Sequence, residues 1–564
     1  MKKRFLQLIF SLGVVIALIP STTIVIVAAT TASGTFGDNL TWELDSSGTL
    51  VIAGTGNMSW LSSNDVPWKS NASSVKKVII NNGITNIGVS AFSGCSNLTN
   101  ITIPKSVSKI ERWAFSGCKN IASIVLPNNL ESIGENAFRG CSSLKSINLT
   151  NSITNIGEYA FFGCESITNI TIPSSISCIE NNTFMSCSGL TTITIPNSVT
   201  IIEEQAFYFC ENLSSIIVSE NVLYIGAEAF DYTAWSSAQP YGLVYLGDFL
   251  YTYKGATSME YNASIAIKEG TIGIVEGAFS SCHNLKSLNI PDSVISIGDN
   301  VFTHCSRLTN IFVDKNNAFY VDVDGVLYTK NQEKIICYPA NKEATSFIIP
   351  QGVKVIEKNA FSRCINLIDV VIPNGVTEIK YDAFIGCTNL RSIILPDSTE
   401  SIGEYAFSGC SNLNSITFSN NILNIETGAF RICKKLQDVF YKGTAEEWNK
   451  MSIGEDNLYL TNANIHYNFS DKATTQSVVK TTNNGCLIDI SLINVPQTSV
   501  TIVAGYSREK FVTMTIVNDL ENHDGIVLNG DFDCIKVMVW ESFTNLKPIT
   551  TSETIYKDSW LPNE

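Results

Sequence analysis

Cysteine is the residue whose spacing most clearly suggests chemistry in this chain. Of 16 cysteines in 564 residues, 12 fall on one repeating register, and no two form a C-x-x-C pair. The first six lie 23 residues apart and are Cys95, Cys118, Cys141, Cys164, Cys187 and Cys210. Thiols could form disulfides or bind zinc, but zinc needs ligands that converge on one point. One copy carries Thr233 in the same slot, so the pattern favours a stack of buried thiols that pack as small hydrophobic groups.

Histidines and carboxylates give little further sign of catalysis or metal binding. The four histidines are His283, His304, His466 and His523. Adjacent repeats could bring the first two together, at most as a weak adventitious metal site. The sequence has no nucleophile elbow, H-E-x-x-H helix or phosphate-binding loop, and nothing marks a groove that would raise carboxylate pKa values. The sequence therefore predicts no enzyme, no cofactor and no metal.

The cysteines belong to a repeat whose apolar positions are fixed. In one copy Leu98, Ile101 and Ile103 alternate as in a short half-buried strand, and Pro104 ends that strand. A phenylalanine lies three residues before each ladder cysteine, and the first six are Phe92, Phe115, Phe138, Phe161, Phe184 and Phe207. One unit cannot bury its own apolar face, whereas stacked units cover one another. The spacing predicts a β-rich solenoid with an aromatic spine, its strands about 4.8 Å apart.

The full repeat reads L-x-x-I-x-I-P-x-x-V-x-x-I-G-x-x-A-F-x-G-C. It resembles the BspA-type leucine-rich repeat of bacterial surface and secreted proteins, and 13 clear copies fill about two thirds of the chain. The resemblance implies a leucine-rich repeat right-handed superhelix with 23-residue repeats and parallel strands on its concave side. It also implies adhesion or ligand binding rather than catalysis.

The N-terminal part divides into a leader and a cap. Residues 1–32 have a basic start and a long apolar run, typical of a signal peptide cleaved after Ala29 or Ala32, with an uncleaved anchor as the alternative. In residues 33–75, apolar and polar residues alternate around Leu40, Trp42 and Leu44 and again from Leu50. This pattern predicts a β-hairpin cap. Relatives of the family carry similar leader segments.

Repeats are expected over residues 76–442, with two β-hairpin excursions at 231–275 and 314–347. In the second excursion, Asp322, Asp324 and Gly325 begin like a calcium loop, but no glutamate stands at the required distance, so a turn is favoured. Residues 443–469 should form a C-terminal cap, with Thr444 and Glu447 as a capping box.

The chain changes character after the cap. Residues 470–484 are polar and threonine-rich, which predicts a linker. Residues 485–564 contain several short β-patterned runs, which predict a small β-sandwich-like domain. Cys486 and Cys534 both belong to this domain, and whether they pair stays open.

Two sets of residues are candidates for a ligand face. On the concave strands the outward positions carry small hydroxyls and amides, namely Thr99, Asn100, Thr102, Thr168, Asn169, Thr171, Thr191, Thr192 and Thr194. The first excursion carries tyrosines that could grip a sugar or a protein, namely Tyr241, Tyr245, Tyr251 and Tyr253. Alternatively, the threonines are present for strand propensity and solubility, and the tyrosines pack on the solenoid rim.

The amino-acid composition limits the classes of molecule that this protein could bind. The net charge of −15 argues against nucleic acid or anionic lipid. No second apolar span follows the leader, so no membrane span is expected after signal cleavage. The favoured hypothesis is a secreted or cell-surface, non-enzymatic protein that binds an extracellular protein or glycan ligand, for example as an adhesin. The alternative is a carbohydrate-binding or structural envelope module.

Overall fold

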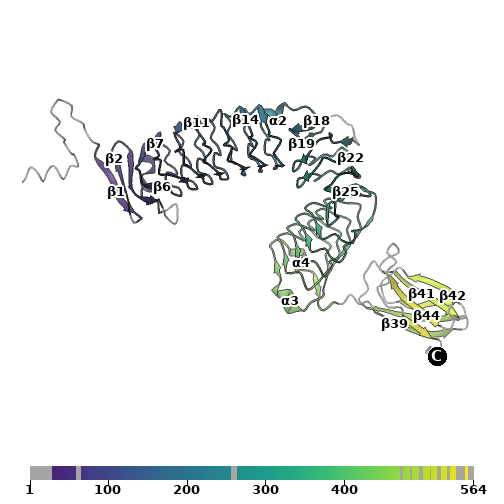
Figure 1. Cartoon of the computed structure of the whole chain (residues 1–564). Helices are drawn as coiled ribbons and strands as arrows, with labels where there is room; N and C mark the ends of the chain where they lie inside the picture. Colours follow the sequence, from purple (N-terminus) through teal and green to yellow (C-terminus); the bar gives the residue numbers. More distant parts are fainter. Residues whose placement is uncertain are drawn as a thin grey trace, which may run out of the picture. The chain divides into compact units, whose positions relative to one another are not determined.

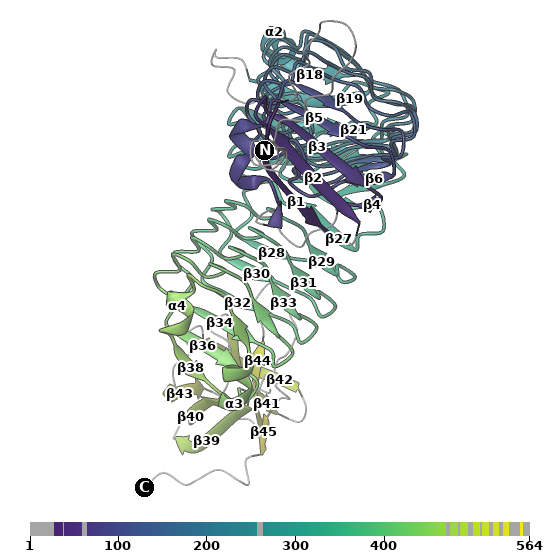
Figure 2. The ribbon, with the colours of Figure 1, turned by 90° about the vertical axis from the view of Figure 1, so that its left-hand side faces the viewer.

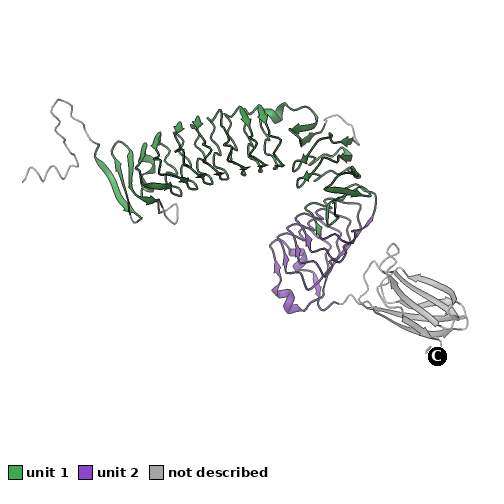
Figure 3. Ribbon diagram, viewed as in Figure 1, with its two compact units in different colours: residues 1–344, 355–366 green, residues 345–354, 367–564 purple. Residues whose placement is uncertain are grey.

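The computed structural model describes residues 28–37, 39–58, 65–255 and 263–469, together with the backbone of seven strands between residues 474 and 556. The expected signal segment therefore lies almost wholly outside the described residues. The chain forms two compact units (Figure 3): residues 1–344 with 355–366, and residues 345–354 with 367–564.

Two ladders of short parallel strands, each divided into separate sheets, run through the first unit (Figure 1). The first ladder contains β5 (Lys77–Ile80), β7 (Asn100–Thr102), β9 (Ser123–Ile124), β11 (Ser146–Ile147), β14 (Thr192–Thr194) and β16 (Ser215–Ile217). The second contains β6 (Ile84–Ile87), β8 (Lys109–Ile110), β10 (Ser132–Ile133), β12 (Asn155–Ile156), β13 (Cys178–Ile179), β15 (Ile201–Ile202) and β17 (Tyr224–Ile225). Partners lie one repeat apart, as in Ile133 opposite Ile110. Since the register equals the repeat length, each apolar side chain lies over its equivalent in the next turn.

Stacked phenylalanine rings form the centre of this array. From Phe92 to Phe230, neighbouring ring centroids are 5.1–5.4 Å apart with nearly parallel planes. These side chains are fully buried. The structure is thus the β-solenoid that the periodicity predicts. The spine begins one ring earlier than the repeat pattern, because Trp68 stacks on Phe92 at 6.0 Å.

The N-terminal cap continues both ladders. Its elements are β1 (Thr30–Phe36), β2 (Leu40–Asp45), β3 (Thr49–Gly54), β4 (Gly56–Asn57) and the 3-10 helix η2 (Lys69–Ser74). β1, β2 and β3 pair antiparallel, and β3 then pairs parallel with β5. β1 begins at Thr30, earlier than the expected cap boundary at residue 33, and Ala32 packs against the core. The alternating small and apolar residues of this stretch explain the extra strand.

The first excursion contains a hairpin that pairs with the strands after it. After α2 (Ala234–Ala238), β18 (Gly242–Leu246) and β19 (Phe249–Lys254) pair antiparallel. β19 then pairs parallel with β21 (Gly273–Ile274). A parallel sheet of β20 (Ala263–Ala266), β22 (Leu285–Ile290) and β24 (Asn310–Val313) accompanies it, and β23 (Ser296–Ile297) follows β21. The hairpin therefore replaces part of a repeat and begins a new sheet, because the sheets of β14–β16 and β13–β15–β17 end before it.

The second excursion consists of β25 (Tyr320–Val323), β26 (Val326–Thr329) and β27 (Lys334–Cys337), which pair antiparallel, and β27 pairs parallel with β29 (Val355–Ile356). Asp324 and Gly325 form its turn in the left-handed region, with φ of 51° and 78°. The Asp322 carboxylate accepts a hydrogen bond from the Val313 backbone N–H at 2.8 Å. This carboxylate thus ties the hairpin to β24.

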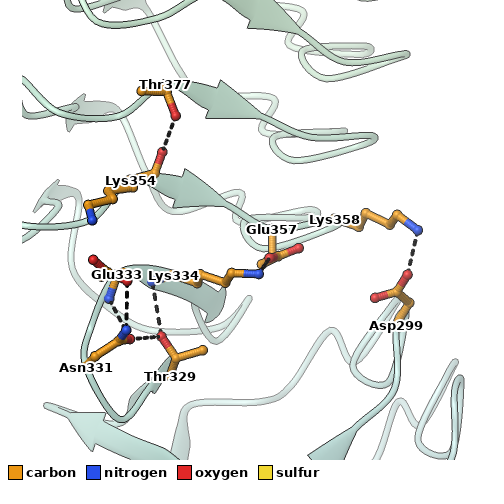
Figure 4. Close-up of polar contacts among 9 residues, drawn as sticks. All are labelled: Asp299, Thr329, Asn331, Glu333, Lys334, Lys354, Glu357, Lys358 and Thr377. Carbon is orange, nitrogen blue, oxygen red and sulfur yellow. Dashed lines mark hydrogen bonds and ion pairs between the residues drawn. The ribbon is translucent and has the colours of Figure 1, made fainter.

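This excursion lacks the A-F-x-G-C turn, so residues from the repeats on either side of it meet directly. Lys358 pairs with Asp299 at 2.5 Å, although 59 residues separate them (Figure 4). The side-chain amide of Asn359 likewise donates a hydrogen bond to the side-chain oxygen of Asn300, 59 residues earlier, at 2.6 Å. Lys334 of β27 pairs with Glu357 at 3.1 Å (Figure 4). These contacts secure the hairpin inside the first unit.

The second unit repeats the same design (Figure 2). One row contains β28 (Ser346–Ile348), β30 (Asp369–Val371), β32 (Ser392–Ile394), β34 (Ser415–Phe418), β36 (Asp438–Tyr441) and β38 (Asn464–His466). The other contains β31 (Glu378–Ile379), β33 (Ser401–Ile402), β35 (Asn424–Ile425) and β37 (Ser452–Ile453). The hydroxyl of Thr377 donates to the Lys354 carbonyl oxygen at 3.3 Å, a bond between successive turns (Figure 4).

Two short helices close this unit. Thr444 and Glu447 form the capping box of α3 (Ala445–Lys450), and α4 (Leu458–Thr461) follows. Trp448 of α3 is buried against Phe418 and Tyr441. The side chain of Asn457 accepts from the Phe430 N–H and donates to the Glu426 carbonyl, both at 2.9 Å. It therefore satisfies backbone groups that a further repeat would otherwise satisfy.

The C-terminal strands form two antiparallel sheets. They are β39 (Thr474–Thr482), β40 (Gly485–Ile493) and β43 (His523–Asn529) in one sheet, and β42 (Lys510–Val517), β41 (Val500–Ser507), β44 (Cys534–Trp540) and β45 (Glu553–Tyr556) in the other. The expectation of a linker over residues 470–484 is wrong for most of its length, because β39 pairs with β40 over nine residues. Threonine and valine favour the extended conformation. Cys486 and Cys534 lie on strands of different sheets.

Candidate functional site

All nine polar candidate positions, from Thr99 to Thr194, are exposed, although Thr168, Asn169 and Thr171 lie outside the assigned strands. Some of their hydroxyls are nevertheless occupied. Thr99 donates to the Lys76 carbonyl at 3.1 Å, and Thr191 donates to the Thr168 carbonyl at 3.4 Å. Each of these bonds joins one repeat to the preceding one. Thr192 also donates to the side-chain oxygen of Asn169 at 3.3 Å. Thr99, Thr191 and Thr192 therefore join successive repeats.

The tyrosines of the first excursion separate into one surface residue and three packed ones. Tyr241 is 67% exposed. Tyr251 is 3% exposed, and its hydroxyl donates to Asp231 at 2.7 Å and accepts from the Phe230 N–H at 2.8 Å. Tyr251 is thus a core residue and not the surface residue expected, because it completes the end of the Phe230 stack.

The other two tyrosines are half-buried and also make contacts within the fold. The hydroxyl of Tyr245 accepts from the Lys268 N–H at 2.9 Å. Tyr253 packs against Phe279 with ring centroids 5.8 Å apart. The rim-packing alternative therefore describes both of these residues, and Tyr241 keeps the surface position.

The structure also shows a row of aromatic side chains on the turn side of the first unit, which the sequence reasoning missed. Its first cluster surrounds Arg139, whose guanidinium carbon lies 5.7 Å from the Trp113 ring, 5.6 Å from Tyr159 and 4.4 Å from Phe162. The guanidinium also donates to the side-chain oxygen of Asn136 at 3.1 Å. The half-buried arginine is thus enclosed by rings and hydrogen-bonded, which is a favourable cation–π arrangement.

The second cluster of this row is the aromatic trio of Tyr208, Phe209 and Tyr232. Phe209 and Tyr232 stack with centroids 4.6 Å apart, and Tyr208 packs edge-on against both, at 4.5 and 5.1 Å. Phe209 and Tyr232 are 37% and 58% exposed. The sequence contains a signal for this cluster: both residues stand where four earlier repeats have glycine in F-x-G-C.

Carboxylates accompany the row. Burial raises the pKa of Glu203, and the nearby carboxylates of Glu180, Glu158 and Glu204 raise it further. The pKa of Tyr208 is raised in the same way, by burial and then by Glu228. These shifts require acidic groups close together along several successive repeats. Of these acidic residues, Glu228 acts on Tyr208, as does Asp231, so these two carboxylates lie near the aromatic trio.

The ladder thiols are buried and hydrogen-bonded. In the middle of the first unit, each ladder thiol donates a hydrogen bond to the backbone carbonyl of the spine phenylalanine 26 residues earlier. Cys118 donates to Phe92 at 3.1 Å, and Cys141 donates to Phe115 at 3.3 Å. The sulfur thus has a polar partner as well as apolar packing. No disulfide joins any of the fourteen cysteines for which the structure describes a side chain.

Replacing Cys141 by serine is expected to lower the free energy of unfolding by about 1–3 kcal/mol. The shorter hydroxyl leaves a gap and holds the Phe115 carbonyl less well at the thiol's position. Urea unfolding of the variant and the wild type measures the difference. Ser146→Ala, at an exposed position of the same repeat, is the control. An unchanged midpoint for Cys141→Ser would contradict a role for the thiol in packing.

The thiols should also make stability depend on pH. Burial raises the pKa of Cys141 from its ordinary value of 9.0 to about 12. Because the folded pKa is the higher one, the thiol stabilises the fold fully below pH 9, and this contribution is lost as the pH rises from 9 to 12. We expect the free energy of unfolding to fall between about pH 9 and about pH 10.5, less steeply in Cys141→Ala. Equal slopes for the two proteins would contradict the assignment.

Metal-binding groups do not assemble in the described part of the chain. Within residues 28–469, apart from the undescribed gaps, no three histidine, cysteine, aspartate or glutamate side chains are placed to hold a metal. His304 has its pKa lowered by burial, by Arg363 and by His283. The positive charge of Arg363 beside His304 disfavours the binding of a metal cation by the two histidines.

Asp382 is the carboxyl group with the largest change among those described. Its pKa is raised to about 6, first by burial and further by Glu404, while a hydrogen bond with Tyr381 lowers it. The neighbouring Tyr381 also stacks edge-on with Tyr405 of the next turn, with centroids 6.1 Å apart. The shift therefore arises from packing between successive repeats.

A hollow of about 540 Å³ lies between the N-terminal cap and the first repeats. Its lining includes Lys69, Ser90, Arg112 and Trp113. The hollow therefore joins the cap to the Arg139 cluster, which shares Trp113. Among the described residues, none of the helices has the length and apolarity to cross a membrane.

The stacked repeats, buried thiols and aromatic spine define the protein as a leucine-rich repeat solenoid. A family model for the BspA type leucine rich repeat region matches residues 70–161, 140–239, 250–323 and 336–458, in six copies. These matches cover more than half of the chain. The protein therefore belongs to the BspA-type leucine-rich repeat family.

Several solved structures are similar to this chain. A leucine-rich repeat protein from Bacteroides ovatus is 24% identical, covering 77% of this chain and 99% of its own, with a TM-score of 0.33. A leucine rich cell surface protein from Faecalibacterium prausnitzii is 24% identical, covering 75% and 97%, with a TM-score of 0.29. The pneumococcal vaccine antigen PcpA is 18% identical, covering 78% and 97%, with a TM-score of 0.27. TM-scores this low carry no argument about the site. Among curated proteins none matches this sequence.

Proposed function

We propose that this protein is exported and acts as a non-enzymatic binding protein at the cell surface, where it mediates protein–protein binding or adhesion. The observation that supports this proposal most strongly is the aromatic trio, which exposes Phe209 and Tyr232, has Glu228 near Tyr208, and is carried on a stacked core. Exposed aromatic side chains within polar surroundings are typical of protein interfaces. The exposed polar rows of the longer strands extend the available surface.

Export is part of the proposal because the chain begins with a basic and apolar leader. The reduced ladder thiols do not oppose export, because burial shields them from oxidants. Burial also raises their pKa values, as for Cys187, so little reactive thiolate forms at neutral pH. The repeats can therefore keep their packing in an oxidising environment.

A binding screen tests the proposal. The mature chain and a version truncated after Asn468 are presented to immobilised extracellular-matrix proteins and to immobilised glycans. Binding of a protein by both versions is expected, since the repeats carry the surface described above. Binding lost on truncation would assign recognition to the C-terminal strands and make the solenoid a spacer. Failure to bind any protein, with binding of a glycan, would favour the second candidate.

That second candidate is a carbohydrate-binding or structural envelope module. Tyr241 favours it, because a largely exposed tyrosine beside a hairpin can stack on a sugar ring. Tyr241→Ala separates the two functions, since it should weaken glycan binding and leave protein binding by the repeats unchanged.

A further inference from the structure

The aromatic trio of Tyr208, Phe209 and Tyr232 has an internal counterpart. Earlier along the same row, Trp113, Tyr159 and Phe162 surround Arg139. The two clusters share a repeat position, because Tyr208 is in the slot of Phe162, two repeats further on. In the earlier cluster the chain supplies its own guanidinium to the rings.

Within the described residues, no cation takes this place at the trio. Among the described residues, the cation–ring contacts are those of Arg139 with its three rings and of Lys268 with Tyr245, and none of them involves the trio. The positions in the trio's own repeats that correspond to Arg139 are Tyr208 and Asp231, which are not cations. Phe209 and Tyr232 therefore present ring surface to solvent, and Tyr232 lies two residues before α2.

The backbone at these positions makes the aromatic residues costly. Phe209 and Tyr232 have φ of 57° and 56°, in the left-handed region. The same slot holds Gly94, Gly117, Gly140 and Gly163 in earlier repeats, with φ between 68° and 75°. Bulky residues are disfavoured there and glycine is not. Since Ser186, Ser281, His304, Arg363 and Ile432 adopt the same conformation in this slot, the conformation belongs to the repeat. What sets Phe209 and Tyr232 apart is that their rings are aromatic, stacked on each other and exposed.

The surrounding charge selects the kind of ligand. Glu228 is exposed beside the trio, and it raises the pKa of Tyr208. Its carboxylate accepts from the Gln205 amide at 2.8 Å, which fixes its direction. Asp231 is bonded to Tyr251 and lies near Lys254, so it contributes less free charge.

We propose that the aromatic trio binds an arginine side chain of a protein partner, stacked on Phe209 and Tyr232 and paired with the carboxylate of Glu228. A planar guanidinium stacks on aromatic faces and pairs with carboxylates at the same time. This inference rests on the proposed function, because it names the residue type by which a protein ligand would be held.

A labelled peptide tests the proposal directly. The probe is fluorescein-Gly-Ser-Arg-Gly-Arg-Ser-Gly, titrated with the full chain and followed by fluorescence anisotropy. The same peptide with citrulline in place of arginine keeps the shape and loses the charge. Saturable binding of the arginine peptide is expected, with the citrulline peptide at least about tenfold weaker. Equal binding of both peptides, or of neither, would overturn the proposal.

Variants then place the binding on the trio. Phe209→Gly with Tyr232→Gly restores the residue of the earlier repeats, so folding should be preserved, and circular dichroism checks this. We expect this double variant to bind the arginine peptide at least about tenfold more weakly. Ile432→Gly is the matched control, since Ile432 is exposed in the same slot with φ of 61°. Undiminished binding by the folded double variant would overturn the assignment.

Removing Arg139 provides a test in which peptide binding should be gained rather than lost. In Arg139→Ala the rings of Trp113, Tyr159 and Phe162 lose their internal guanidinium, and a second peptide site is expected, visible as two bound peptides per chain. If the stoichiometry stays at one, the counterpart argument fails. Since these measurements use a defined peptide, a negative result here and a positive matrix-protein screen would reject the arginine site while leaving the proposed function standing.

Discussion

Replacing Phe138 by alanine is expected to lower the free energy of unfolding by about 3–5 kcal/mol. The ring is fully buried and lies 5.2 Å from Phe115 and 5.4 Å from Phe161, nearly parallel to both. Its removal therefore leaves a cavity that faces two neighbouring turns, and neither neighbour can close it without shifting its own repeat. Because stability in a stacked array is a sum of nearest-neighbour contacts, the loss acts on both interfaces.

Denaturant unfolding followed by circular dichroism measures this loss. Val125→Ala is the control in the same unit, since Val125 is 80% exposed, and a change within about 0.5 kcal/mol is expected for it. Similar effects of the two substitutions would show that the phenylalanine stack does not carry the stability of the array.

The second large effect is expected from Trp68→Ala, also about 3–5 kcal/mol. The buried indole stacks on Phe92 and meets Phe36 and Trp42 edge-on, at 5.4 and 5.9 Å. Its N–H donates to the Ala91 carbonyl at 2.6 Å. Alanine would remove the ring that joins the cap to the first repeat and would leave that carbonyl without this donor.

Hydrogen exchange locates this second effect. Faster exchange is expected in β2, β3 and β5, with little change in β32 and β34 of the second unit, because contacts in a solenoid are local. Trp68→Phe is the informative control: it keeps a ring and loses the donor, so a smaller loss of about 1–3 kcal/mol is expected. Protection factors in the cap that do not change in Trp68→Ala would contradict its role as the first ring of the spine.

The spacing of residues is enough to predict the solenoid and its spine. A 23-residue period leaves one way to bury Phe92 and its successors, which is to stack them, and the thiols must then stack as well. The capping box at Thr444 is equally visible, because it depends on residues three positions apart. Such features need only local sequence and a repeated register.

Other features depend on contacts that the spacing does not state. The sequence leaves Tyr251 either at the surface or packed on the rim of the solenoid, and the structure buries it against Phe230, where the stack of rings ends. Asp299 meets Lys358 only because the intervening hairpin lacks the usual turn. Residues 474–482 read as a linker, since a polar, threonine-rich stretch becomes a strand only where another strand pairs with it.

The candidate site lies between these two cases. The sequence shows that Phe209 and Tyr232 replace glycine, which marks them as departures from the repeat. Only the tertiary structure shows that their rings stack, that Tyr208 supports them, and that a related cluster already holds Arg139. The sequence by itself determined the repeat, because one period fixes every backbone register. The side chains that share a surface were decided by the tertiary structure, because their distances depend on how successive turns stack and on where a turn is missing.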